Sequence, residues 1–209
     1  MSARRNLTTT VDRYRRGALV VLEGPDRVGK STQVEQLAHL LRQLGRSVLV
    51  SREPGGDALG EAIRTMVLAS HLDPWTEIFL FLAGRARHLD EVIEPALAHG
   101  ELVLLDRYTP STLVYQGAEL GDEVVAELCS LPVFRTPELT IILDRELPLA
   151  ELEASDRFES TGLAGWQVRR SRYLSFSHRF GWTTVSGEGS EEEVVLRLLD
   201  VLTAAGIIE

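Results

Sequence analysis

Residues 18–31 read ALVVLEGPDRVGKS, and this stretch decides the fold. Its last eight residues match the phosphate-binding loop pattern G-x-x-x-x-G-K-[ST] in full. The apolar run before Glu23 is typical of a parallel strand that is buried on both faces. Residues 32–44 then carry apolar side chains at helical spacing, and Gly45 follows as a stop signal. Strand, glycine loop and helix thus follow in the order that a phosphate-binding loop requires.

Lys30 is the only lysine of the chain, and it occupies the lysine position of this loop. A compact ammonium group can reach between β- and γ-phosphate oxygens, whereas a guanidinium group is larger and prefers forked contacts. Backbone N–H groups from Gly24 to Gly29 and at the helix start near Thr32 would face an anion, and the Ser31 hydroxyl would ligate Mg²⁺. The pattern predicts binding of a nucleoside triphosphate. A glycine turn that binds nothing is the alternative.

The composition indicates a single globular domain. The chain has 209 residues, of which 44% are hydrophobic, and we expect one large α/β domain over 17–209. Residues 1–16 are polar and precede the first apolar run, so we expect a flexible N-terminal arm there. The net charge of −9 argues against nucleic-acid or membrane-surface partners, because binding their phosphates requires a basic face.

Cysteine usage and hydropathy bear on the compartment. Cys129 is the only cysteine, which excludes an intramolecular disulfide and a cysteine metal site, and we interpret it as a core thiol rather than a nucleophile. No apolar run approaches about 18 residues, and the N-terminus has no hydrophobic signal core. We therefore expect a soluble, cytoplasmic protein.

Predicted strands and helices alternate along the chain. Apolar runs predict strands over 18–22, 47–50, 102–105, 139–143 and 182–185. Helices are predicted over 57–68, 111–117, 122–130 and 165–180, with one long helix over 74–98 and a last helix after a capping box at Ser190 and Glu193. This alternation predicts an α/β P-loop NTPase fold, in which helices cover both faces of a mostly parallel sheet of about five strands.

Charged side chains gather where the predicted strands end. Lys30, Arg52, Asp106 and Arg107 follow three of the strands, and Asp156-Arg157 lies farther along. Ligands of a doubly wound sheet bind at the carboxyl ends of its strands. A solvated surface charge is the alternative for any single arginine, but several arginines at strand ends favour a site for phosphates.

Four further motifs accompany the glycine loop. In order, the five read EGPDRVGKSTQ at 23–33, REPGG at 52–56, LFLAGRARH at 80–88, DRY at 106–108 with Ser111 and YQG at 115–117, and DRFE at 156–159. This series resembles the thymidylate kinases, which make dTDP from dTMP and ATP. The resemblance extends over nearly all of the chain from Gly17 to Leu202. Five motifs in the family's order are far more specific than a glycine loop, which many NTPases share.

The resemblance implies an ATP-dependent kinase that uses Mg²⁺. The residues implied to bind ATP are Gly24, Gly29, Lys30, Ser31, Thr32 and Arg157. Lys30, Arg27, Asp106 and Arg107 would act in the transfer, and Ser31 and Asp106 would hold the metal or its waters.

The resemblance also implies how the phosphate and sugar of dTMP bind. Arg52 and Arg107 would grip the acceptor phosphate with forked donors, in a site that also includes Pro54 and Ser111. Asp26 would accept a hydrogen bond from the 3′-hydroxyl.

The base would lie against a helix. Phe81 would stack on the thymine ring, and Arg85, one turn later, would donate to a pyrimidine carbonyl. Gln116 would approach the base edge, and Tyr115 would stack on the sugar and crowd a 2′-hydroxyl. The alternatives are that Phe81 is a core residue and that Tyr115 is a structural hydrogen bonder.

Such a transfer depends on placing two anionic substrates in line and neutralising the γ-phosphoryl oxygens, so no protein nucleophile is needed. We interpret His71, His88, His99 and His178 as structural or surface groups, because none has a carboxylate spacing that demands catalysis.

The predicted lid, at about 146–160, departs from a pattern common in the family. Residues 146–155 contain no arginine or lysine, where many members place a basic residue. Other members carry that arginine in the phosphate loop, and Arg27 matches this arrangement. The alternative donors are Arg157 and, on the following helix, Arg169 or Arg170.

Two alternative functions stay open from the sequence. One is a kinase of the same fold for another pyrimidine nucleotide or nucleoside, and the other is a nucleotide-binding regulator with little turnover, which the acidic lid favours. The family resemblance and the apolar residues of the long helix also predict a homodimer, with the interface near 78–97.

Overall fold

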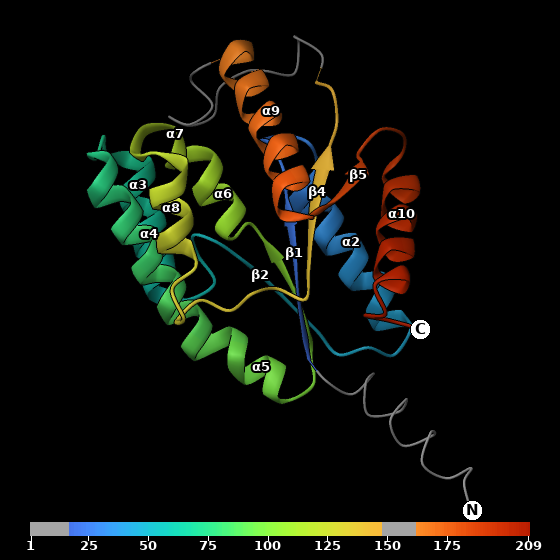
Figure 1. Cartoon of the computed structure of the whole chain (residues 1–209). Coiled ribbons are helices and arrows are strands. Elements are labelled where there is room, and N and C mark those ends of the chain that lie inside the picture. The colour runs from blue at the N-terminus through green and yellow to red at the C-terminus, as the bar shows by residue number, and fades with distance from the viewer. Residues whose placement is uncertain (1–16, 148–161) are drawn as a thin grey trace, which may run out of the picture.

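The structure is a computed structural model that describes residues 17–147 and 162–209 (Figure 1). The N-terminal arm predicted over 1–16 lies outside the described residues, as does nearly all of the lid predicted over about 146–160. Arg157 lies outside them too. The single domain over 17–209 therefore stays a prediction.

Five strands of the described chain form one parallel sheet in the order β2-β3-β1-β4-β5. They are β1 (Ala18–Glu23), β2 (Val48–Arg52), β3 (Leu102–Asp106), β4 (Leu139–Asp144) and β5 (Thr183–Ser186). The bounds differ from the predicted strands by at most two residues. The predicted fold class is confirmed.

The strand register brings the charged strand ends together. Arg52 at the end of β2 and Leu22 of β1 are both aligned with Asp106 at the end of β3. In the strand order, β3 lies between β1 and β2, and β1 lies between β3 and β4. The connection from β1 to β2 and the connection from β3 to β4 therefore run in opposite directions along the sheet. Ligands of open parallel sheets bind in the crevice at such a switch point.

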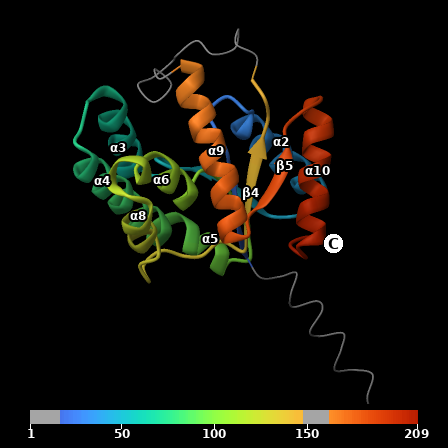
Figure 2. The same cartoon turned by 45° about the horizontal axis from the view of Figure 1, so that its top comes forward.

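Alternation along β1 supplies apolar side chains to both faces of the sheet. Ala18, Val20 and Leu22 pack against α2 (Lys30–Gln43) and α10 (Glu191–Ala204), which lie side by side in Figures 1 and 2. Leu19 and Val21 pack on the opposite face against η1 (Leu89–Ile93) and α5 (Glu94–Ala98). The continuous apolar run of β1 thus reflects burial on two sides.

The long helix predicted over 74–98 is divided. It consists of α4 (Pro74–His88), the π-helical turn η1 and α5. The wider turn ends two residues before Pro95, which cannot donate the usual helical hydrogen bond.

Five further helices lie in the described chain. They are α3 (Ala58–Ala69), α6 (Thr109–Tyr115), α7 (Gly117–Leu120), α8 (Asp122–Cys129) and α9 (Gly162–Phe180). The capping box predicted at Ser190 and Glu193 is present at the start of α10. No helix in the described residues is long and apolar enough to cross a bilayer.

Candidate active site

The loop that joins β1 to α2 depends on its glycines. Gly24 has a φ of 140°, and a Cβ there would lie 2.4 Å from the backbone oxygen of Leu143. Gly29 also has a positive φ, of 95°. In the described chain, the only residues other than glycine with a positive φ are Arg27 (φ 68°) and Arg107 (φ 73°). Left-handed backbone at a non-glycine residue points to a functional constraint.

Lys30 is 5% exposed at the first position of α2. Its Nζ donates to the backbone oxygen of Pro25 over 2.6 Å. Burial lowers the pKa of Lys30 to about 8, an effect that the charge of Arg107 reinforces and that of Asp106 opposes. Lys30 lines a polar cavity, the phosphate-loop cavity, which consists of Asp26, Arg27, Gly29, Lys30, Ser31, Thr32, Arg52, Glu53, Arg64, Asp106 and Arg107.

Ser31 and Asp106 form a pair of hard oxygen donors in this cavity. The Ser31 hydroxyl donates to Asp106 Oδ2 over 2.5 Å, and Asp106 Oδ1 is buried without a hydrogen-bond partner. The part of the chain that the structure describes has no cluster of three or more His, Cys, Asp or Glu side chains that could hold a metal. A hydroxyl and a carboxylate fit Mg²⁺, which takes its other ligands from phosphates and water.

Asp26 links the phosphate loop to Arg107 and Tyr115. Its Oδ1 accepts from Arg107 Nη2, and its Oδ2 accepts from the Tyr115 hydroxyl over 2.6 Å. Burial alone would raise the pKa of Asp26, but the charges of Arg107 and Lys30 outweigh this effect and lower it to about 2. Asp26 is therefore an anion at neutral pH.

Glu23, at the end of β1, organises the segment after β3. Its fully buried carboxylate accepts from the backbone nitrogens of Tyr108 (2.6 Å) and Ser111 (3.1 Å) and from the hydroxyls of Ser111 (2.7 Å) and Tyr173 (3.1 Å). Burial raises the pKa of Glu23, against the lowering effect of Arg107. Arg107 Nη1 donates in turn to Ser111 Oγ over 3.0 Å and to the Tyr173 hydroxyl over 3.1 Å.

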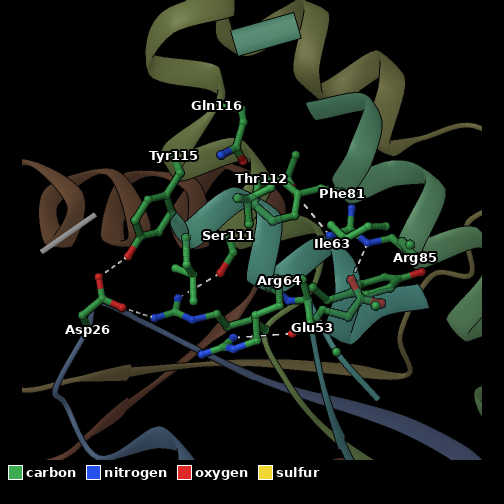
Figure 3. A pocket seen from close by; sticks show the side chains of 18 residues that line it. Asp26, Glu53, Ile63, Arg64, Phe81, Arg85, Ser111, Thr112, Tyr115 and Gln116 are labelled. Carbon is green, nitrogen blue, oxygen red and sulfur yellow. Dashed lines mark hydrogen bonds and ion pairs between the residues drawn. The ribbon is translucent and has the colours of Figure 1, made fainter. Parts of the chain in front are cut away.

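A second pocket, the α4 pocket, is drawn in Figure 3 and shares lining residues with the phosphate-loop cavity. It encloses about 860 Å³, part of it open to solvent. Its lining comes from the phosphate loop, the turn after β2, α3, α4, the segment after β3 and α6 with its C-cap: Asp26, Glu53, Pro54, Gly55, Gly60, Ile63, Arg64, Val67, Leu68, Phe81, Gly84, Arg85, Arg107, Tyr108, Ser111, Thr112, Tyr115 and Gln116.

Glu53 fixes the polar end of this pocket. Its Oε2 accepts from Arg85 Nε over 2.7 Å, and its Oε1 lies 3.3 Å from His88 Nδ1. Arg85 Nη2 also donates to Thr112 Oγ1 over 3.0 Å, so the guanidinium group is held from two sides. His88 is fully buried and contacts the Ser51 hydroxyl over 2.8 Å, in keeping with a structural role.

Two further arginines, Arg52 and Arg64, line the phosphate-loop cavity. Arg52 has a half-exposed side chain and forms an ion pair of 2.9 Å with Glu61. Arg64 lines both cavities, and its Nη1 lies 3.4 Å from the backbone oxygen of Pro54. Sequence reasoning missed Arg64, although it faces the turn of the REPGG motif from the next helix.

The structure brings together most of the predicted site residues. The phosphate-loop cavity contains Arg27, Gly29, Lys30, Ser31, Thr32, Arg52 and Asp106, and the α4 pocket contains Pro54, Phe81, Arg85, Ser111, Tyr115 and Gln116. Asp26 and Arg107 line both. Gly24 lines neither, but its carbonyl accepts from Arg107 Nη1 over 3.3 Å. Glu23, Glu53 and Tyr173 were not predicted, because their roles depend on contacts between distant segments.

The two alternative arginines on α9 have other contacts. Arg170 forms a two-pronged pair with Asp144, at 2.6 and 2.9 Å, and also reaches Glu146. The guanidinium carbon of Arg169 lies 4.9 Å from the ring centre of Tyr115.

Cys129 does not have the environment of a nucleophilic cysteine. Burial raises the pKa of its thiol, whereas a nucleophilic cysteine requires a lowered pKa.

Comparison with known proteins gives a consistent result. Residues 22–197 match the family model of thymidylate kinase. The chain is 40% identical over 202 residues to a thymidylate kinase of Dinoroseobacter shibae, across 90% of this chain and 98% of that one. It is 47% identical over 176 residues to a thymidylate kinase of Bifidobacterium longum, across 77% and 84% of the two chains.

A solved structure shares the fold. The crystal structure of thymidylate kinase from Ehrlichia chaffeensis superimposes with a TM-score of 0.74, over 90% of this chain and 99% of that chain. The sequence identity is 24%, so this likeness concerns the fold alone.

Proposed function

The chain belongs to the thymidylate kinase family, and we propose that it transfers the γ-phosphoryl group of ATP to dTMP, giving dTDP and ADP. The observation that carries this proposal is the meeting of the two cavities at Asp26, Glu53, Arg64 and Arg107. A donor in one cavity and an acceptor in the other would present their phosphates to each other there. Such positioning is the main requirement of phosphoryl transfer.

ATP would place its β- and γ-phosphates in the phosphate-loop cavity. The backbone between Gly24 and Gly29, with Ser31 and Thr32 at the start of α2, would donate N–H groups to the phosphate oxygens. Lys30 would release the Pro25 carbonyl and contact the γ-phosphate, where anionic oxygens would raise its pKa again. Arg157 would also contact ATP, as the family resemblance implies.

Mg²⁺ would accompany ATP at Ser31 and Asp106. The unpartnered Asp106 Oδ1 and the adjacent hydroxyl supply the oxygen ligands that this ion prefers. When bound, the ion neutralises charge on the phosphate oxygens during transfer.

dTMP would fill the α4 pocket with its phosphate toward Arg107. Arg52, Arg64 and Arg107 would hold that phosphate with forked donors, and Asp26 would accept from the 3′-hydroxyl. Phe81 would stack on the thymine ring, and Arg85 would donate to a carbonyl of the base. Glu53 and Thr112 keep the Arg85 guanidinium in the required orientation.

The transfer step needs no covalent intermediate. Lys30 and Arg27 would stabilise charge that develops on the γ-phosphoryl oxygens, while Arg107 holds the attacking phosphate oxygen in line. The buried Glu23 network fixes Arg107 before substrates arrive, which lowers the cost of ordering it.

The decisive experiment is ADP release in a coupled assay with ATP and dTMP, beside ATP binding measured alone. Rapid ADP release that requires dTMP supports the kinase, whereas ATP binding without turnover supports a regulator. dUMP and thymidine as alternative acceptors test for a kinase with another preference: a higher kcat/KM for either would overturn dTMP as the substrate.

We also propose that the protein is a cytoplasmic homodimer. Ile78, Leu89 and Ile93, which the sequence suggested for the interface, are buried in the chain's own core. Several exposed apolar side chains lie on α3 and the start of α4, namely Leu59, Met66, Trp75 and Phe79, the last two with rings 5.9 Å apart. Light scattering at micromolar concentration should give twice the chain mass, and Phe79→Glu should halve it. A wild-type monomer contradicts the proposal.

A further inference from the structure

Gln116 separates the α4 pocket from a neighbouring cavity. This α9 cavity is lined by His71, Leu72, Pro74, Glu77, Val114, Tyr115, Gln116, Ala118, Glu119, Ala164, Gly165, Val168, Arg169 and Arg172. Gln116 lines both spaces, whereas Glu77 lines the α9 cavity and not the α4 pocket. Both side chains are buried, at 5% and 7% exposed. The wall between the two cavities thus contains a buried polar pair.

The pair has a defined hydrogen-bond direction. Gln116 Nε2 donates to Glu77 Oε1 over 2.7 Å. A carboxylate only accepts hydrogen bonds, so the NH₂ group of the amide must face Glu77. The opposite orientation would set the amide oxygen against an anion in a buried site, where such a contact is costly.

The amide oxygen therefore turns away from the α9 cavity. In Figure 3 the Gln116 amide points toward the space beside Thr112 and Phe81 in the α4 pocket. Within the described chain, no side chain or backbone group donates to this oxygen. The pocket thus presents an acceptor whose own requirement is met only by a ligand or by water.

Helix α4 carries further side chains of the same recognition surface. Glu77, Phe81 and Arg85 follow at intervals of four residues and so lie along one face of the helix. Arg85 lines the pocket as a donor, and Gln116 as an acceptor. A base with a carbonyl next to a ring N–H matches this pattern, whereas a base with an amino group next to an unprotonated ring nitrogen has both polarities reversed.

We propose that Glu77 is a positioning residue that fixes the amide polarity of Gln116 and makes the α4 pocket select pyrimidines with an N3–H over 4-aminopyrimidines. The identity of the acceptor rests on the proposed function. The selection itself concerns binding and is measured without turnover.

The test compares dTMP with 5-methyl-dCMP, which has the same sugar, phosphate and methyl group. Dissociation constants are measured by calorimetry for the wild type and Glu77→Gln. The neutral amide at position 77 can accept or donate, so Gln116 gains both orientations. We expect 5-methyl-dCMP to bind about tenfold more tightly and dTMP about twofold more weakly. A purely structural role predicts that both ligands weaken together, and that result overturns the proposal.

Glu119→Gln is the matched control. Glu119 is exposed, lines the same α9 cavity and loses the same charge in this variant, so the ratio of the two dissociation constants should stay within twofold of wild type. A shift as large as that of Glu77→Gln would assign the effect to charge alone and overturn the proposal.

Gln116→Met provides a second route if Glu77→Gln fails to fold. It removes the acceptor, so it should lower the preference for dTMP by about tenfold, mainly through weaker dTMP binding. An unchanged preference overturns the proposal.

Turnover of the wild type separates the proposed function from the role of Glu77. Binding of dTMP without phosphorylation contradicts the proposed function. Phosphorylation of dTMP, together with an unaltered ratio of the two dissociation constants in Glu77→Gln, contradicts only the role of Glu77.

Discussion

The phosphate-loop cavity and the α4 pocket share four residues but are built in different ways. Most groups of the first lie between Asp26 and Thr32, on one loop and the start of one helix. Polar groups of the second are held by distant partners: Glu53 holds Arg85, 32 residues away, and Glu77 holds Gln116, 39 residues away. A local motif is therefore sufficient to specify phosphate binding, whereas base recognition depends on how α4 packs against the sheet and α6.

The largest effect should come from the phosphate loop. Lys30→Ala should lower kcat by at least about 10³-fold, because the described cavity offers no second ammonium group to contact the γ-phosphate. Steady-state assays at saturating ATP and dTMP measure this loss. Lys30→Arg is the matched control: it keeps the charge but not the size, and we expect at least about 10²-fold loss. Turnover within a few-fold of wild type in either variant contradicts the assignment of the loop.

Arg27→Ala should follow, with a loss of at least about 10²-fold in kcat and nearly unchanged dTMP binding. Arg27 lines the cavity beside Lys30 in a left-handed backbone conformation. Arg170 is paired with Asp144 and Glu146, so Arg170→Ala should reduce kcat less. A small loss at Arg27 together with a large loss at Arg157, Arg169 or Arg170 would refute the loop-arginine mechanism.

The α4 pocket should respond through the acceptor. Phe81→Ala should raise the KM for dTMP by about 5- to 150-fold, because stacking on a base contributes about 1–3 kcal/mol. The KM for ATP should stay within twofold. Phe180→Ala, at a 41% exposed ring on the far end of α9, is the control and should alter neither constant. An effect on ATP instead of dTMP would place the acceptor elsewhere.

The same contrast explains what the sequence could predict. The strand order along the chain, the phosphate loop and the capping box of α10 depend on neighbouring residues, and each was predicted from local pattern. The family resemblance supplied Phe81, Arg85 and Gln116. It assigned no role to Glu53, which orients Arg85, or to Glu77, which orients Gln116.

Residues that act across the sheet gave no local signal. Glu23 ends an apolar strand, and only the fold shows that it holds both Ser111 and Tyr173. Apolar periodicity does not distinguish a chain's own core from an interface, so the sequence could not show that Ile78, Leu89 and Ile93 are buried within the chain while Phe79 is exposed. The π-helical turn is a different case, because Pro95 is a local signal for an interruption and the prediction of one continuous helix did not use it.

The smallest effect is a pH dependence that separates the two cavities. Burial lowers the pKa of Lys30 to about 8, so the free enzyme loses the ammonium charge as pH rises through that value. kcat/KM for ATP reports the free enzyme and should be nearly constant below about pH 7, fall about twofold by pH 8 and fall about tenfold by pH 9. ATP binding restores the charge and should take up about a quarter of a proton at pH 7.5 and about three quarters at pH 8.5. Calorimetry in buffers of different ionisation enthalpy measures this uptake. dTMP binding alone, in the α4 pocket, should show no such rise between these pH values, and equal uptake with both ligands would assign the titration to a group other than Lys30.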